Sequence, residues 1–109
     1  MERALFVVQR LTAVLLAALV LVHLATILYA SNGGLSAGEI LDRTRGSLGW
    51  AVFYAVFMIA AALHAPIGIR NVLNEWTPLS RRAADVIAAA FLLLLLAAGA
   101  RAIHAVYVA

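Results

Sequence analysis

Hydrophobic residues gather in three long runs along the chain, and none of these runs contains Asp, Glu, Lys or Arg. Each run approaches or exceeds the roughly 20 residues that a helix needs to cross a bilayer. The pattern therefore predicts an all-α membrane protein, built as a single domain over residues 1–109. The runs cover residues 11–30, 46–69 and 86–100. With their flanking residues they predict transmembrane helices at about 4–30, 47–73 and 82–107.

The two connections between the runs differ in length. The first contains an Asn-Gly-Gly turn at residues 32–34, followed by Ser36 and Glu39 at the spacing of a helix capping box. We expect a short interfacial helix there, from about Ala37 to Arg43. The second connection is short and contains a proline, so the second and third spans are expected to form an antiparallel hairpin.

Composition agrees with this interpretation, and the distribution of charge predicts how the chain is oriented in the membrane. The chain is 66% hydrophobic and 12% charged, outside the range of soluble domains, and all eight cationic residues are arginines. Positive charges collect on the cytoplasmic side of membrane proteins, so their distribution predicts a cytoplasmic N-terminus and a multi-pass protein of the bacterial inner membrane. Membrane lipid explains these arginines, and nucleic acid is not an expected partner. The expected cytoplasmic side holds Arg3, Arg10, Arg70, Arg81 and Arg82, against Arg43, Arg45 and Arg101 on the other side.

Neither an iron-sulfur cluster nor a cleaved signal peptide is expected in this chain. The chain has no cysteine, so an iron-sulfur cluster held by thiolates would have to belong to a partner protein. The first apolar run is longer than the roughly 7–15 residues of a signal-peptide core, so we expect this span to be retained.

The second run carries a polar stripe. His64, Gly68, Asn71 and Glu75 recur at helical spacing and share one face, and Pro66 interrupts the backbone bonding near the histidine. Polar groups at membrane depth usually face the bundle interior. An imidazole there suits haem iron, and Gly68 would leave room for a flat macrocycle. The alternatives are a histidine satisfied by a neighbouring hydroxyl or carbonyl, and a glycine that allows close helix packing.

The first run has a similar stripe, made of Gln9, Thr12, His23 and Thr26. His23 and His64 are expected at different depths, because they lie on opposite sides of the middle of their antiparallel spans. They are therefore not expected to ligate the same iron. In the third run, His104 lies one turn from Arg101. It is a candidate ligand, a propionate partner or an interfacial residue, and we favour the last.

Two short motifs carry a family resemblance. The first is Gln9-Arg10-Leu11-Thr12-Ala13 followed by His23, and the second is His64-x-x-x-Gly68-Ile69-Arg70 continuing to Glu75-Trp76. Both resemble the signatures of the membrane-anchor cytochrome b subunits of succinate dehydrogenase and fumarate reductase. Together with hydropathy, the resemblance covers nearly the whole chain. Three positions depart from the usual pattern, with Gln9 where histidine is common, Glu75 for aspartate and Trp76 for tyrosine.

The resemblance implies a non-catalytic anchor subunit whose three helices form half of a haem-binding bundle. It implies haem b as cofactor, with His64 as iron ligand, His23 as ligand of a second haem, and Gly68 close to the cofactor. His104, outside these motifs, stays a further candidate for cofactor binding. It further implies flavoprotein and iron-sulfur partners, and a second anchor subunit or a copy of this chain. Quinone is the implied substrate, and the residues implied for its site are Arg10, Glu75 and Trp76.

Two alternatives remain beside this hypothesis. One is a haem-free structural anchor of the same respiratory family, in which the histidines only donate and accept hydrogen bonds. The other is a small multidrug-type transporter, which is disfavoured because such proteins generally need four spans and a membrane-embedded glutamate. In this sequence every acidic residue stands at the boundary of a span.

Overall fold

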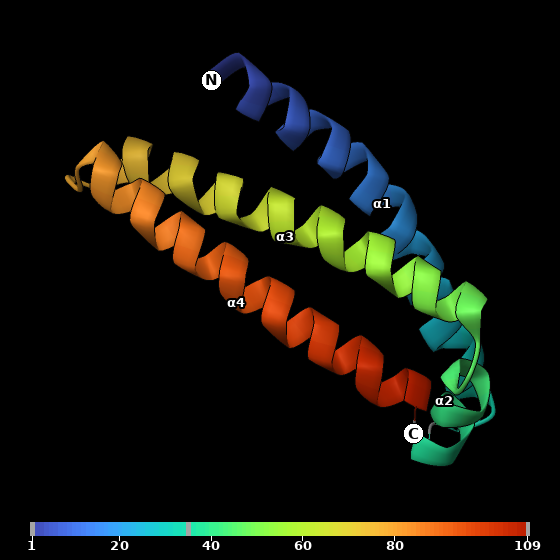
Figure 1. The fold of residues 1–109 in the computed structure, drawn as a ribbon. Coiled ribbons are helices and arrows are strands. Elements are labelled where there is room, and N and C mark those ends of the chain that lie inside the picture. The colour runs from blue at the N-terminus through green and yellow to red at the C-terminus, as the bar shows by residue number, and fades with distance from the viewer. Residues whose placement is uncertain (1, 35, 109) are drawn as a thin grey trace.

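The computed structural model describes residues 2–34 and 36–108, and its regular structure there is entirely helical (Figure 1). Three of the four helices are long and apolar enough to cross a membrane, which confirms the three expected spans. The short helix expected in the first connection is also present. The elements are α1 (Glu2–Asn32), α2 (Ala37–Thr44), α3 (Leu48–Trp76) and α4 (Arg81–Val108).

The three long helices lie in a row with α3 in the middle (Figure 1). Helix α3 packs against both α1 and α4, whereas α1 and α4 make no contact with each other within the described residues. A row of three helices cannot enclose a core as a closed bundle does. Many large apolar side chains are consequently exposed, among them Leu11, Leu21 and Leu93. These surfaces are suited to lipid or to helices of another subunit.

Small side chains form the contact between α3 and α4. The buried apolar residues of these two helices are Ala60, Ala62, Pro66, Ala84 and Ala88. Small residues let helix backbones approach closely, which is how helices associate where lipid is as apolar as the side chains. Helix α3 continues through Pro66 without a break.

Gly99 extends this close contact toward the C-terminal end of α4. A Cβ placed on Gly99 would overlap the side chain of Met58 on α3 and would lie 2.5 Å from its sulfur. The glycine is therefore required by the packing of Met58 and not by backbone conformation, since its φ is ordinary for a helix.

The first connection is built by local capping. Ser36 Oγ accepts a hydrogen bond of 3.1 Å from the backbone N–H of Glu39, as the capping-box spacing predicts. Gly34 and Gly46 flank this segment with φ values of 86° and 65°, a region that side chains with a Cβ rarely adopt. These two glycines allow the chain to leave α1 and to enter α3 in tight turns.

The same connection also caps α4. The last carbonyl groups of a helix have no partner within it. Here the N–H of Gly46 donates to the carbonyl of Tyr107 over 2.9 Å, and the hydroxyl of Thr44, which is buried, shares its single hydrogen between the carbonyls of Val106 and Ile40 at 3.0 and 3.1 Å. The hairpin of α3 and α4 is thus closed at one end by residues that lie about 60 positions earlier in the sequence.

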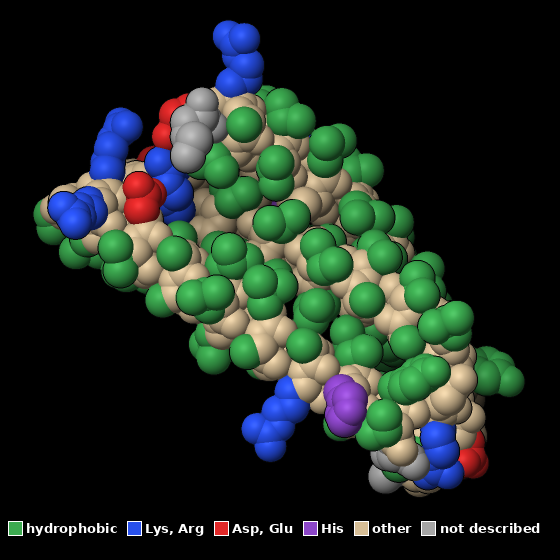
Figure 2. Space-filling model, viewed as in Figure 1, with side chains coloured by type: hydrophobic (Ala, Val, Ile, Leu, Met, Phe, Trp, Pro, Cys, Tyr) green, Lys and Arg blue, Asp and Glu red, His purple; other side chains and the backbone are tan. Residues whose placement is uncertain are grey.

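At the opposite end, one arginine joins all three long helices. Arg70 of α3 forms ion pairs with Glu2 of α1 over 2.8 Å and with Asp85 of α4 over 2.6 Å. Its side chain is only 14% exposed, although both carboxylates are largely in solvent. The two outer helices, which do not contact each other, are therefore linked through Arg70. Figure 2 shows that charged side chains gather at the two ends of a largely hydrophobic surface.

Candidate functional site

His64 lies on α3 and faces α1. Its Nδ1 is 3.3 Å from Oγ1 of Thr12, which is one of the few buried polar side chains. No other hydrogen bond to His64 occurs in the described part of the chain, so Nε2 has no protein partner there. The two stripes predicted on the first and second spans thus meet at this point. The hydroxyl expected in the alternative interpretation is present, but it satisfies only one of the two ring nitrogens.

Gly68 and Gln9 meet one turn away on the same pair of helices. A Cβ added to Gly68 would lie 3.4 Å from Nε2 of Gln9, closer than most Cβ contacts. The space that the glycine leaves is therefore used by the Gln9 side chain on the α1 side. The predicted role of Gly68 beside a macrocycle stays a prediction.

A cavity opens between α1 and α3 next to this contact, toward the end marked by Arg70. It has a volume of about 490 Å³ and includes both Arg10 and Glu75, two of the three residues predicted to contact quinone. The guanidinium of Arg10 lies 5.1 Å from the centre of the Phe6 ring, within cation–π range. The lining residues are Glu2, Leu5, Phe6, Gln9, Arg10, Asn71 and Glu75.

Gln9 adds an unpaired acceptor to this cavity. Its Oε1 is buried and has no hydrogen-bond partner. A buried polar atom without a partner costs free energy, on the order of 1–3 kcal/mol, so such an atom in a cavity points to a donor supplied by a ligand or water. The sequence placed Gln9 and Asn71 on the polar stripes but gave no reason to assign them to the quinone site. Their position in one cavity with Arg10 depends on how two helices pack.

Trp76, the third predicted quinone contact, directly follows Glu75 but is not one of the residues that line the cavity. It is the last residue of α3 and is 80% exposed. Its indole is open to lipid or to another subunit, and its contact with quinone stays a prediction.

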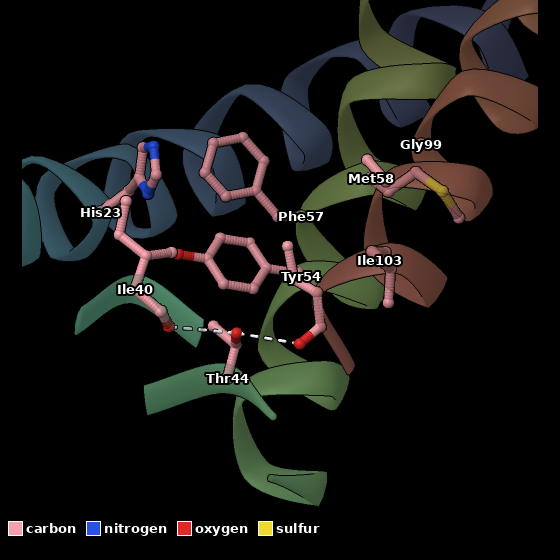
Figure 3. Close-up of a pocket in the computed structure, with 10 residues that line it drawn as sticks. His23, Ile40, Thr44, Tyr54, Phe57, Met58, Gly99 and Ile103 are labelled. Atoms are coloured by element: carbon pink, nitrogen blue, oxygen red, sulfur yellow. Dashed lines mark hydrogen bonds between the residues drawn. The ribbon is translucent and has the colours of Figure 1, made fainter. Parts of the chain in front are cut away.

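His23 lies at a second cavity, near the other end of the helices. This cavity has a volume of about 370 Å³ and is bordered by α1, α2, α3 and α4. Figure 3 shows the rings of His23, Tyr54 and Phe57 grouped together, and the two aromatic rings meet the imidazole edge-on at centroid distances of 5.9 and 5.6 Å. Nδ1 of His23 is buried without a partner. The sequence did not single out Tyr54 or Phe57, because aromatic residues in a span are ordinary.

His104 does not join His23 at this cavity. Its neighbours Ile103 and Val106 line the cavity, whereas His104 itself is exposed on α4. This position agrees with the interfacial role favoured by the sequence. No group of three or more His, Asp or Glu side chains that could hold a metal ion occurs within residues 2–34 and 36–108.

Comparison with known protein families decides which class of membrane protein this is. The family model described as succinate dehydrogenase/fumarate reductase transmembrane subunit matches residues 2–99. The chain belongs to this family. No curated protein and no solved structure matches the chain.

As a member of the succinate dehydrogenase/fumarate reductase transmembrane family, the protein is a membrane-anchor subunit. The matched segment contains the Thr12–His64 contact, the cavity of Arg10 and Glu75, and His23. His104 lies beyond it. Family membership thus covers both stripes of the first and second spans but says nothing of the histidine on α4.

The chemistry of His64 fits a haem ligand. An axial ligand to haem iron needs one neutral imidazole nitrogen with a free lone pair, and a second bond at the other nitrogen commonly fixes the ring. His64 offers this combination, because Thr12 is at Nδ1 and Nε2 is unpaired. Haem would need contacts from outside this row of three helices, since His64 borders none of the cavities described above.

Proposed function

We propose that this subunit anchors the catalytic subunits of a succinate:quinone oxidoreductase-type complex, holds haem b through His64, and contributes to the site where membrane quinone is reduced or quinol oxidised. The observation that carries the haem assignment is the imidazole of His64, fixed at Nδ1 by Thr12 and unpaired at Nε2 within a membrane-spanning helix. Family membership supports the anchor role.

The proposed partners rest on family membership, which implies an iron-sulfur subunit that passes electrons to the membrane and a flavoprotein that supplies them. The absence of cysteine agrees with this, because an iron-sulfur cluster held by thiolates cannot belong to this chain. The open row of α1, α3 and α4 leaves apolar faces that need covering, which supports a second anchor subunit or a second copy of this chain. Haem, when bound, supplies a one-electron redox centre between the carriers.

The cavity of Arg10, Gln9 and Glu75 is the proposed quinone site. Quinone reduction takes up two electrons and two protons, so the site needs a donor to a carbonyl oxygen and a group that can pass a proton. The guanidinium of Arg10 is a permanent donor, and the carboxylate of Glu75 can accept and release a proton. Gln9 lines the same cavity and carries a side-chain amide that can donate to a quinone carbonyl or accept from a quinol hydroxyl. The expected cytoplasmic orientation would connect this cavity to the proton supply.

Removal of the His64 imidazole tests the haem assignment. The complex should be purified with its partner subunits, and the reduced-minus-oxidised spectrum of haem b recorded for the wild type and for His64→Ala. We expect His64→Ala to lose most of the haem signal, because its iron ligand is gone. Leu63→Ala is the matched control, since Leu63 is the neighbouring residue on α3 and is 40% exposed.

The outcomes separate the proposal from its alternative. An assembled His64→Ala complex with an unchanged spectrum would reject His64 as ligand. A wild-type complex without a Soret band would select the haem-free structural anchor. His23 remains the predicted ligand of a second haem, and its orphaned Nδ1 supports a ligand at that cavity without identifying it.

A further inference from the structure

The hydroxyl of Thr12 stands between α1 and α3 with three polar neighbours. The carbonyl oxygens of Val8 and Gln9 lie 2.7 and 3.2 Å from Oγ1, and Nδ1 of His64 lies 3.3 Å away. A threonine hydroxyl has a single hydrogen to donate and two lone pairs with which to accept. The carbonyl of Val8 is the nearer acceptor, and two oxygens 2.7 Å apart repel unless a hydrogen lies between them, so the hydroxyl hydrogen points to Val8.

A second threonine on the same helix shows where the hydrogen goes. Thr26 donates to the carbonyl of Val22 over 2.8 Å, four residues earlier, as Thr12 does to Val8, and within the described residues it has no hydrogen bond to an imidazole. Bonding to the carbonyl of residue i−4 is the ordinary behaviour of threonine in a helix. The hydrogen of Thr12 is therefore committed to the backbone of α1, and the lone pairs of Oγ1 face His64.

The direction of the Thr12 hydroxyl determines which ring nitrogen of His64 carries the hydrogen. Two lone pairs placed 3.3 Å apart repel, whereas an N–H placed there forms a hydrogen bond. The neutral imidazole must then carry its hydrogen on Nδ1 and donate it to Thr12, which leaves the lone pair on Nε2. Apart from the ion pair of Arg70 and Glu2, this is the one side-chain hydrogen bond between α1 and α3 in the described residues.

We propose that Thr12 is a positioning residue which fixes the tautomer and ring orientation of His64 and makes Nε2 a stronger electron donor toward the haem iron. This inference rests on the proposed function of His64. When the ring nitrogen that does not bind the metal donates a hydrogen bond, the imidazole ligand becomes more basic. A more basic ligand favours ferric over ferrous iron, so Thr12 lowers the midpoint potential of the haem. Through this hydrogen bond, the position of α1 influences the midpoint potential of the haem that His64 of α3 would hold.

The test compares Thr12→Val, Thr12→Ser and Thr26→Val in the complex purified with its partner subunits. Valine keeps the branched shape of threonine and removes the hydroxyl, whereas serine keeps the hydroxyl. Thr26→Val is the matched control, because it removes the same kind of backbone bond from the same helix without touching a histidine. The readouts are haem content, midpoint potential and the low-spin electron paramagnetic resonance signal of the ferric haem, which reports on the imidazole ligand.

We expect Thr12→Val to hold ferric haem about tenfold less tightly, as is typical when a partner of a metal-ligating histidine is lost. If the affinity for ferrous haem is unchanged, the midpoint potential rises by about 59 mV, the one-electron equivalent of that factor. The resonance signal of Thr12→Val should shift as well. Thr12→Ser and Thr26→Val should keep the wild-type potential and signal.

Two results are distinguishable. In the first, the wild-type complex contains haem, and Thr12→Val shows the same midpoint potential and the same resonance signal. That result overturns the role of Thr12 and leaves the proposed function standing. A wild-type complex that contains no haem overturns the proposed function itself. If Thr12→Val fails to assemble, Thr12→Ala takes its place, because it also removes the hydroxyl: a shifted resonance signal supports the bond to His64, and a wild-type signal refutes it.

Discussion

At the scale of single residues, the polar side chains of α1 and α3 are arranged as pairs across one helix contact. Thr12 meets His64, and Gln9 meets Gly68. Next to these pairs, Arg10 shares a cavity with residues of α3. The contact between two membrane-spanning helices is thus polar on this face, where a purely structural contact would need only small apolar residues.

Arg10 provides a prediction at this scale. A hydrogen bond from a charged donor contributes about 1.5–3 kcal/mol, so Arg10→Gln should raise the KM for quinone by about tenfold or more. Succinate oxidation with a water-soluble electron acceptor should be unchanged, because that reaction bypasses the membrane site. Arg3→Gln is the control, since Arg3 is an exposed arginine of α1 that does not line the cavity. Equal KM values for both variants would remove Arg10 from the quinone site.

At the scale of elements, close packing of α3 on α4 depends on small residues. Gly99→Ala would push a Cβ into the side chain of Met58. Overpacking of this kind costs about 1–3 kcal/mol, and the flexibility of methionine places the expected loss at the lower end. Gly49→Ala is the matched control within a span, because a Cβ there meets nothing within 4 Å. It should be neutral or slightly stabilising.

Thermal unfolding of the purified complex in detergent measures both changes. The melting temperature should fall in Gly99→Ala, and the same substitution should cause a smaller fall in a Met58→Ala background, because the clash is then absent. A melting temperature for Gly99→Ala equal to that of Gly49→Ala would show that the two helices are not held at this distance.

Sequence patterns predict single elements better than the contacts between them. The three spans follow from hydropathy, and α2 follows from the spacing of Ser36 and Glu39, because both signals are local. Helical spacing also placed Thr12 and His64 on polar faces, but a periodicity does not say which neighbouring helix a face meets. The cap that Thr44 provides for α4 was not predicted for the same reason, since it joins residues 62 positions apart.

At the scale of the whole molecule, the row of three helices is linked at one end by Arg70 and at the other by α2. Neither link follows from local sequence. Arg70 ends the second family motif of the sequence, and the structure uses it in ion pairs with Glu2 and Asp85. Between these two links the outer faces remain open, which is the geometry expected of one part of a larger assembly.

The ion pairs of Arg70 predict that the melting temperature of the complex depends on salt concentration. Because Glu2 and Asp85 are largely exposed, each pair should contribute only about 0.2–1 kcal/mol, and salt should weaken it. Arg70→Gln should lower the melting temperature at low salt and reduce the difference between low and high salt. Arg82→Gln is the control, since Arg82 makes none of the ion pairs found in the described residues. An unchanged salt dependence in Arg70→Gln would contradict the link.

An experimental density map of the assembled complex is the direct test of whether His64 presents Nε2 to a haem iron. We expect a tetrapyrrole whose iron is bonded to Nε2 of His64 at a distance near 2 Å, as for other imidazole–metal bonds, with Nδ1 still hydrogen-bonded to Thr12. A map in which the His64 side chain faces lipid or packed side chains, with no tetrapyrrole beside it, would contradict the account.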